Sequence, residues 1–191
     1  MRALVIVAHP DDELIWMGGF ILKNKDWIFD VISLCRKNDE DRAPKFKKVC
    51  YELNAHYCNM SDLDDEALTN VREIEIVDRV LDMLDKDEYD YVFTHGLNGE
   101  YGHKRHREIN KAVRNMIKRK ELKCRKLFYF SYRKENGFCH INPNADKLIK
   151  LDNSTFSKKK SLIVETYGFP KGGFEEQCCL NKEAFNVIEI K

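Results

Sequence analysis

The sequence contains no apolar run long enough to cross a membrane. Its longest clean apolar run is Ala3 to Ala8, whereas a membrane-spanning helix needs about 20 apolar residues. His9, Asp11 and Asp12 follow this run at once and interrupt the pattern that a secretory signal peptide requires. We therefore expect a cytoplasmic protein without a membrane anchor.

The cysteines lack the spacing of a metal-binding finger. There are seven of them, and no pair has the CxxC spacing. An odd number without a secretory signal predicts reduced thiols. Adjacent Cys178 and Cys179 also lack the spacer that two ligands of one metal ion normally need. We do not expect cysteine to carry the chemistry of this protein.

Neither sign of charge dominates, and proline and glycine are scarce. The 33 Lys and Arg residues oppose 32 Asp and Glu residues, which leaves a net charge of +1 and no general attraction to nucleic acid. The basic stretch Lys118 to Lys126 has no interleaved aromatic residues, so a nucleic-acid partner is not expected. Lys158, Lys159 and Lys160 are predicted to form a solvated face. With only four Pro and nine Gly, the composition is typical of a globular chain.

Hydrophobic patterns alternate between short apolar strands and amphipathic helices. Expected strands cover residues 3–8, 27–35, 91–94, 127–132, 148–151 and 185–190. Expected helices cover residues 14–24, 43–56, 71–84, 103–120 and 156–165. Alternation at this spacing predicts an α/β fold with a mostly parallel sheet. The 191 residues fit one domain of ordinary size, so we assign residues 1–191 to a single domain.

Two polar clusters follow predicted strands. Residues 9–13 follow the first strand, and residues 95–106 follow the strand over residues 91–94. Ligands of open α/β sheets bind beyond the carboxyl ends of the strands. His9 and Asp12 could each supply one metal ligand from a single turn, and one histidine of the second cluster would complete a site of three ligands. Three protein ligands and an open position are the arrangement of a catalytic zinc.

Other groups in the two clusters suggest roles beside such a metal. Asp11 could act as the general base for the attacking water. His103 and His106 are three residues apart and share a helix face, so one could bind metal while the other faces the substrate. In the plainer alternative, the acidic residues after His9 only cap a helix. A second metal alternative is the facial triad of non-haem iron oxygenases, which His9 and Asp11 fit by spacing, although we expect that site on an all-β barrel.

Two segments of the chain resemble motifs of a known family. Residues 8–13 read AHPDDE, with Gly18 and Gly19 following, and residues 99–106 read GEYGHKRH. The first segment resembles the signature of the PIG-L/LmbE-like deacetylases, and the second resembles that family's Tyr-Gly-His-x-x-His loop. The resemblance extends over nearly the whole chain and is fainter after Tyr132, where Lys158, Lys159 and Lys160 resemble the family's late lysine-bearing helix.

The resemblance implies a Rossmann-like three-layer fold and a zinc-dependent hydrolase, with ferrous iron as the other metal that these ligands tolerate. It implies that the metal ligands are His9, Asp12 and His106. It also implies that Asp11 is the general base, that His103 stabilises the tetrahedral intermediate, that Tyr101 contacts the carbonyl or the substrate and that Arg42 binds substrate.

The implied reaction removes the acetyl group from an N-acetylglucosamine-type amide of a soluble glycoside or glycoconjugate. The substrate partner is thus a small molecule or an oligosaccharide that carries an N-acetyl amino sugar, and a homo-oligomer is compatible with the sequence. Asp11 accepts the proton of the attacking water, and either Asp11 or His103 protonates the leaving amine.

One departure from the family pattern concerns the residues between the two histidines. Family members commonly have Pro-Asp or a similar pair there, where this chain has Lys104 and Arg105. A carboxylate would orient His103 and favour its protonated form, and an arginine would do the reverse. Asp64 or Asp65 is the candidate replacement partner. The departure keeps open the alternative of a non-catalytic carbohydrate- or metal-binding protein with the same fold.

Overall fold

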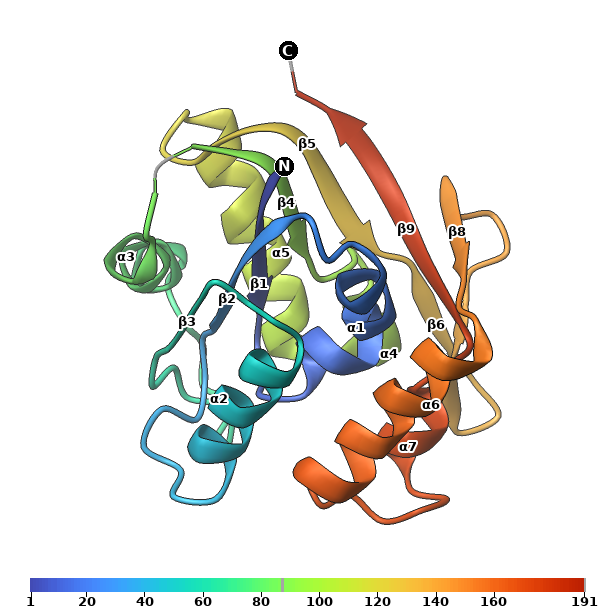
Figure 1. The fold of residues 1–191 in the computed structure, drawn as a ribbon. Coiled ribbons are helices and arrows are strands. Elements are labelled where there is room, and N and C mark those ends of the chain that lie inside the picture. Colours follow the sequence, from blue (N-terminus) through green and yellow to red (C-terminus); the bar gives the residue numbers. More distant parts are fainter. Residues whose placement is uncertain (87, 191) are drawn as a thin grey trace.

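The computed structural model describes residues 1–86 and 88–190. Figure 1 shows strands and helices alternating along the chain. The strands are β1 (Arg2–Val7), β2 (Ile28–Ser33), β3 (Tyr57–Met60), β4 (Glu88–Thr94), β5 (Lys123–Phe130), β6 (Tyr132–Glu135), β7 (Phe138–Ile141), β8 (Lys147–Lys150) and β9 (Lys182–Glu189). The helices are α1 (Asp12–Lys23), α2 (Arg42–Glu52), α3 (Glu73–Met83), α4 (Gly99–Gly102), α5 (Lys104–Lys118), α6 (Asn153–Ser161), the π-helix η1 (Leu162–Thr166) and α7 (Phe174–Cys178).

The main sheet has seven strands in the order β3-β2-β1-β4-β5-β9-β8. The pairs from β3 through to β5 are all parallel, whereas β9 runs antiparallel to both β5 and β8. Since β1 lies between β2 and β4, the segments after β1 and β4 emerge at the same edge of the sheet. The predicted α/β class with a mostly parallel sheet is therefore confirmed.

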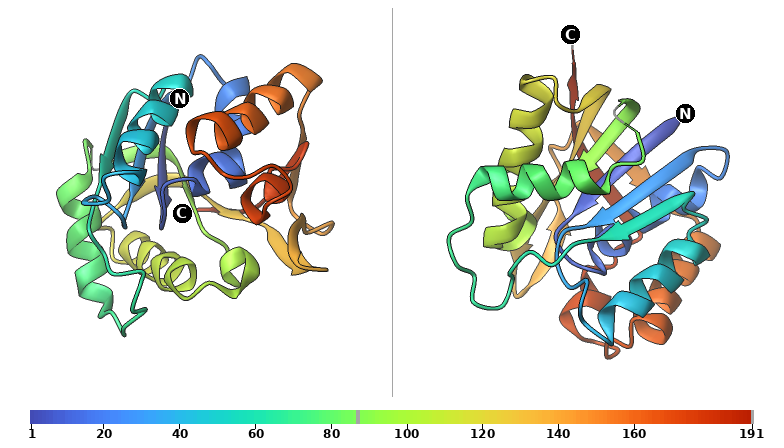
Figure 2. Two further views of the ribbon diagram at one scale, coloured as in Figure 1. Left: turned by 90° about the horizontal axis from the view of Figure 1, so that it is seen from below. Right: turned by 90° about the vertical axis from the view of Figure 1, so that its left-hand side faces the viewer.

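Helices cover both faces of the sheet and give it three layers (Figure 2). Alternate residues of β1 point to opposite faces. Val5 and Val7 join the apolar cluster beneath α1, α2 and η1, whereas Leu4 and Ile6 join the cluster beneath α3 and α5. Both faces of β1 are buried, which explains why its sequence is continuously apolar instead of alternating.

Helix α1 is buried from Asp12 to Ile21, because α6, α7 and β9 pack against it in addition to the sheet. Its two glycines lie where space is short. A Cβ atom at Gly19 would lie 2.4 Å from Leu151 Cδ1 and 3.0 Å from Glu183 Oε1. The absence of a side chain at Gly19 thus lets Leu151 and Glu183 approach the helix backbone.

Several elements differ from the sequence-based expectations. The edge strand β3 was not expected, because it has only four residues and most of them are half-buried. The antiparallel hairpin of β6 and β7 was also missed, because its exposed residues Arg133, Lys134 and Glu135 hide the apolar alternation. Short helix α4 lies in a segment that we expected to be a loop, and short helix α7 lies in a segment for which we predicted no element.

The prediction of a solvated face for the three consecutive lysines is wrong for Lys159. This side chain is fully buried, and its Nζ lies 2.7 Å from Glu183 Oε1, which is equally buried. Glu183 Oε1 and Oε2 also accept hydrogen bonds from the backbone N–H groups of Gly19 and Phe20. The ion pair therefore joins α6 and β9 to the middle of α1, a contact that the charge pattern could not reveal.

Within the described residues, no helix combines the length and apolar character that a membrane span requires.

Candidate functional site

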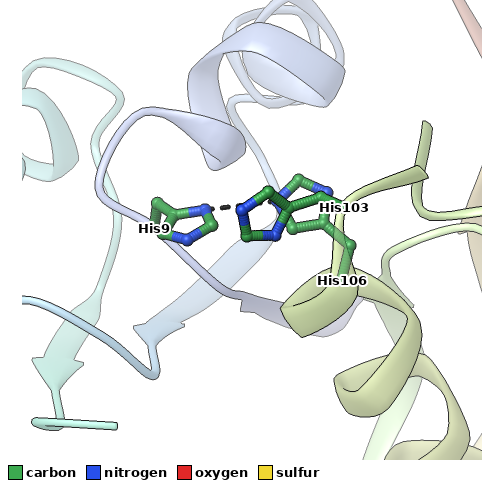
Figure 3. A group of neighbouring side chains, drawn as sticks. All are labelled: His9, His103 and His106. Atoms are coloured by element: carbon green, nitrogen blue, oxygen red, sulfur yellow. Dashed lines mark hydrogen bonds between the residues drawn. The ribbon is translucent and has the colours of Figure 1, made fainter. Parts of the chain in front are cut away.

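The two polar segments meet at the carboxyl edge of the sheet. One follows β1 and leads into α1, and the other follows β4 and leads through α4 into α5. His9 of the first segment lies next to His103 and His106 of the second, as Figure 3 shows. The sequence separates these residues by more than 90 positions, and the parallel pairing of β1 with β4 brings them together.

The turn before α1 aims its carboxylates in different directions. Asp11 has a φ angle of 126°, which lies in the region that L-residues rarely adopt. Asp12, the first residue of α1, folds back so that Oδ2 accepts the backbone N–H of His9 at 2.9 Å. Its Oδ1 accepts the indole N–H of Trp16 at 2.7 Å. Asp12 is thus held at both oxygens, and Trp16 serves as its buried hydrogen-bond donor.

Three possible ligand atoms converge at one point. His9 Nδ1 lies 3.1 Å from Asp12 Oδ2, His106 Nε2 lies 3.3 Å from the same oxygen, and the two nitrogens are 3.2 Å apart. Ligands placed about 2.0–2.1 Å from a tetrahedral zinc are separated by about 3.3 Å. The three observed distances match this separation. His103 is a further candidate beside them, because its ring nitrogens lie within 4.8 Å of ligand atoms of His9 and His106.

The charges around this point favour a cation. Burial lowers the pKa of His106, but the carboxylates of Asp12 and Glu100 outweigh it and raise this pKa to about 10. The neighbouring imidazoles of His106 and His95 hold the pKa of Asp12 well below its usual range despite burial. The negative charges of Asp12 and Glu100 thus stabilise a positive charge at this point, as a cation site requires.

Asp11 lies beside this cluster and contacts Arg42. Arg42 Nη1 is 3.3 Å from Asp11 Oδ2, and the guanidinium carbon lies 4.3 Å from the ring centroid of Phe169. Burial and the charge of Asp12 raise the pKa of Asp11 well above its ordinary value, while Arg42 lowers it. The structure thus places Arg42, which was predicted to bind substrate, in contact with Asp11.

Among the residues that the structure describes, no carboxylate pairs with His103. Its Nδ1 is buried without a hydrogen-bond partner among the described residues. Burial and the nearby histidines His106 and His9 lower the pKa of His103 to about 3. Its ring packs edge-on against that of His9, with centroids 4.7 Å apart.

Asp64 and Asp65 were the expected partners of His103, but both contact other residues, so this expectation is wrong. Asp64 Oδ2 lies 2.9 Å from Nη2 of Arg105, whose side chain is fully buried. Asp65 Oδ2 lies 2.8 Å from Arg36 Nε and 3.5 Å from His9 Nε2. The arginine between the two histidines is thus used in an ion pair with Asp64, and Asp65 contacts a different histidine.

A cavity of about 570 Å³ opens in front of these residues. Tyr101, His103, Asp11 and Arg42 line it, together with residues that the sequence did not single out. These additional lining residues are Arg36, Lys134, Phe174 and Glu175, and Asp65, which the sequence offered as a partner for His103, lines the cavity as well. They come from β6, α7 and the segments after β2 and β3, so no local motif connects them to the site. The volume lies within the range of about 300–1,000 Å³ that is usual for small-molecule sites.

Glu100 and His95 form a second buried layer behind the cluster. The sequence placed His95 after β4 but gave no partner for it, and it gave no sign of Glu100. Glu100 has a φ angle of 56° and a ψ angle of −63°, a combination that residues other than glycine rarely adopt. No sequence pattern predicts that a glutamate occupies such a position.

Comparisons with solved structures support the fold. The N,N'-diacetylchitobiose deacetylase from Pyrococcus horikoshii is 15% identical with a TM-score of 0.71, over 98% of this chain and 84% of that chain. The 4-carboxy-2-hydroxymuconate hydratase GalB from Pseudomonas putida is 13% identical with a TM-score of 0.69, over 100% of this chain and 97% of that chain. At these identities the similarity shows the fold alone, and the two enzymes carry out different reactions.

Sequence comparisons are more specific. The chain is 25% identical over 187 residues to uncharacterized protein L374 of Acanthamoeba polyphaga mimivirus, which covers 85% of this chain and 80% of that protein. Residues 4–117, which include both loops of the cluster, match the PIG-L family, described as GlcNAc-PI de-N-acetylase. Because this match spans more than half of the chain, the protein belongs to the PIG-L family.

Proposed function

We propose that this protein is a metal-dependent hydrolase that removes the acetyl group from an N-acetylglucosamine-type amide of a glycoside or glycoconjugate. The convergence of His9 Nδ1, Asp12 Oδ2 and His106 Nε2 within 3.1–3.3 Å of one another, beside the carboxylate of Asp11, carries this proposal. Membership of a family described as de-N-acetylases supports it.

In this proposal, His9, Asp12 and His106 hold the metal, and His9, the partly exposed member, faces the cavity. A zinc or ferrous ion bound there would polarise the acetyl carbonyl and lower the pKa of water. Asp11 lines the cavity and accepts the proton of the attacking water. Arg42 holds the Asp11 carboxylate in place through its contact at 3.3 Å.

Tyr101 and His103 would stabilise the developing oxyanion. Burial raises the pKa of the Tyr101 phenol, which keeps its O–H available as a donor. His103, with its pKa lowered to about 3, is neutral near pH 7 and can donate one ring N–H. Each such preorganised donor is worth about 3 kcal/mol in other oxyanion sites.

The lowered pKa of His103 also bears on which residue protonates the leaving amine, for which Asp11 and His103 were the two candidates. A neutral His103 carries no proton to spare, whereas Asp11 has just received one from the water. We therefore assign this step to Asp11, which would shuttle a single proton from the water to the amine nitrogen.

The fold argues against the iron-oxygenase alternative, which we expected on an all-β barrel. The non-catalytic alternative differs from the proposed function in one measurable outcome. It predicts binding of metal and sugar without release of acetate.

The first test is the metal content of the purified protein and of His106→Ala after mild loading with zinc. We expect about one zinc ion per chain, lost in the variant. The loaded protein is then assayed for free amine and acetate from N,N'-diacetylchitobiose and from simple N-acetylglucosamine glycosides. A wild-type protein that binds no metal would overturn the proposal, and one that binds metal and sugar but releases no acetate would favour the non-catalytic alternative.

A further inference from the structure

A buried carboxylate supports the metal cluster from behind. Glu100 is 1% exposed, and its Oε2 accepts from His106 Nδ1 at 2.5 Å and from His95 Nδ1 at 3.0 Å. Its Oε1 accepts the backbone N–H of Gly96 at 2.6 Å. Both oxygens therefore act as acceptors, and both histidines present Nδ1 to the same carboxylate.

The far nitrogens of the two histidines have different surroundings. His106 Nε2 points to the cluster, 3.3 Å from Asp12 Oδ2 and 3.2 Å from His9 Nδ1. His95 Nε2 lies 2.8 Å from the backbone N–H of Ala8. Because that group can only donate, His95 Nε2 must accept, and the proton of neutral His95 must lie on Nδ1.

The backbone at Glu100 indicates that its side chain is needed there. Its φ of 56° is positive, and glycine adopts positive φ angles far more readily than residues with a side chain. Glycine would remove the strain at this position, but it would leave His106 Nδ1, His95 Nδ1 and the Gly96 N–H without their acceptor. The strained conformation thus accompanies three hydrogen bonds to a single carboxylate.

We propose that Glu100 is a positioning residue for the metal site, which fixes His106 with its proton on Nδ1 and its lone pair on Nε2 toward the metal. His95 holds the second side of Glu100 and is itself anchored to the end of β1 through Ala8. A carboxylate behind a ligating imidazole orients the ring and increases its basicity. When the imidazoles of His9, His95 and His106 are neutral, the two negative charges of the buried carboxylates Asp12 and Glu100 together balance the charge of one divalent cation. This inference rests on the metal site of the proposed function.

A different assignment would make His95 itself a ligand, because ligand atoms of Asp12, His95 and His106 lie within 4.8 Å of one another. The geometry argues against it. His95 Nε2 is 3.6 Å from Asp12 Oδ2, and its lone pair is already used by the Ala8 N–H. The two assignments predict different variants to lose the metal.

The test compares zinc affinities by chelator competition in the wild type and in Glu100→Gln. A glutamine replaces one of the two acceptor oxygens with an NH₂ group, which must face either Gly96 N–H or the two histidine N–H groups. We expect zinc to bind about 10- to 100-fold more weakly, as for other partners of metal-ligating histidines. Glu183→Gln is the matched control, since it removes another fully buried carboxylate and should lower the melting temperature without changing zinc affinity.

A second measurement does not depend on the folding of Glu100→Gln. In wild-type protein loaded with ¹¹³Cd and labelled with ¹⁵N-histidine, the metal should couple to Nε2 of His106, and a proton should be seen on its Nδ1. Glu100→Gly, which relieves the backbone strain but removes the carboxylate, should weaken zinc binding as Glu100→Gln does.

Three outcomes would overturn the inference while leaving the proposed function intact. They are metal bound to Nδ1 of His106, zinc affinity in Glu100→Gln within twofold of the wild type, and loss of metal in His95→Asn with retention in Glu100→Gln. A wild-type protein that takes up no metal would overturn the proposed function and this inference together.

Discussion

Arg42 and Asp11 meet in the lining of the cavity, with Arg42 Nη1 3.3 Å from Asp11 Oδ2. Arg42 begins α2, and Asp11 lies in the turn before α1. Asp11 is crowded by the negative charges of Asp12 and Glu13, which together with burial raise its pKa, and Arg42 is the cation that lowers it. The contact therefore tunes the carboxylate to which we assign the role of general base.

Replacement of Arg42 by methionine should shift the pH dependence of the reaction. Removing the positive charge raises the pKa of Asp11 further, and a general base must be ionised to accept a proton. The acidic limb of the kcat/KM profile should therefore move to higher pH, which steady-state assays across pH 5 to 9 would detect. Arg42→Lys keeps the charge and should move the limb less, so equal shifts in both variants would contradict the electrostatic account.

Asp11→Asn should abolish most of the turnover and leave the metal in place. The amide keeps the size of the side chain but cannot accept the proton of the water, and general-base catalysis is typically worth about 10²- to 10⁴-fold in rate. Acetate release by zinc-loaded protein measures the loss, and elemental analysis checks that zinc content equals that of the wild type. Near-normal turnover in a fully loaded sample would show that another group is the base.

Zinc binding should release at least one proton near pH 7. The pKa of His106 in the metal-free protein is raised to about 10, so its ring is protonated at neutral pH and must lose a proton before it can bind metal. Zinc affinity should consequently rise with pH between 6 and 8. Calorimetry in two buffers of different ionisation enthalpy counts the protons, and a heat that is independent of the buffer would contradict the assignment of His106 as a ligand.

Two adjacent lysines should contribute very differently to stability. Lys159→Met leaves the fully buried carboxylate of Glu183 without its cation, and breaking a buried ion pair in this way costs about 3–5 kcal/mol. Lys158 pairs with Glu52 at the surface, and both side chains are substantially exposed, so Lys158→Met should change stability little. Urea denaturation of both variants measures the difference. Equal destabilisation would mean that the ion pair does not anchor α6 and β9 to α1.

Much of the fold could be predicted because the information is local. Ala3 to Ala8 is apolar without interruption, which is typical of a strand buried on both faces, and β1 is such a strand. The apolar positions Ile109, Val113 and Met116 predicted a helix that α5 confirms. Elements with little periodic signal were missed, namely β3, the hairpin of β6 and β7, and the short helices α4 and α7.

The candidate site divides in the same way. The predicted group of His9, Asp12 and His106 lies together in the structure, with Asp11, His103, Tyr101 and Arg42 around it, although their chemical roles remain predictions. The partners of these residues were not predictable. Asp65 was considered for His103 but contacts His9. His95 and His106 lie only five and six residues from Glu100 in the sequence, but no sequence pattern indicates the positive-φ backbone at Glu100 that accompanies its contacts with both.

Local sequence patterns were sufficient for the strands and helices with strong hydrophobic periodicity, for the turn that carries Asp11 and Asp12, and for the spacing of His103 and His106. These depend on neighbours within a few residues, where backbone geometry fixes which side chains share a face. Three features follow from the folded arrangement alone. They are the pairing of β1 with β4, the burial of Lys159 against Glu183 and the positive φ angle of Glu100 behind His106. Each of these depends on contacts between residues that the chain places far apart or on strain that packing must hold, and local propensity contains neither.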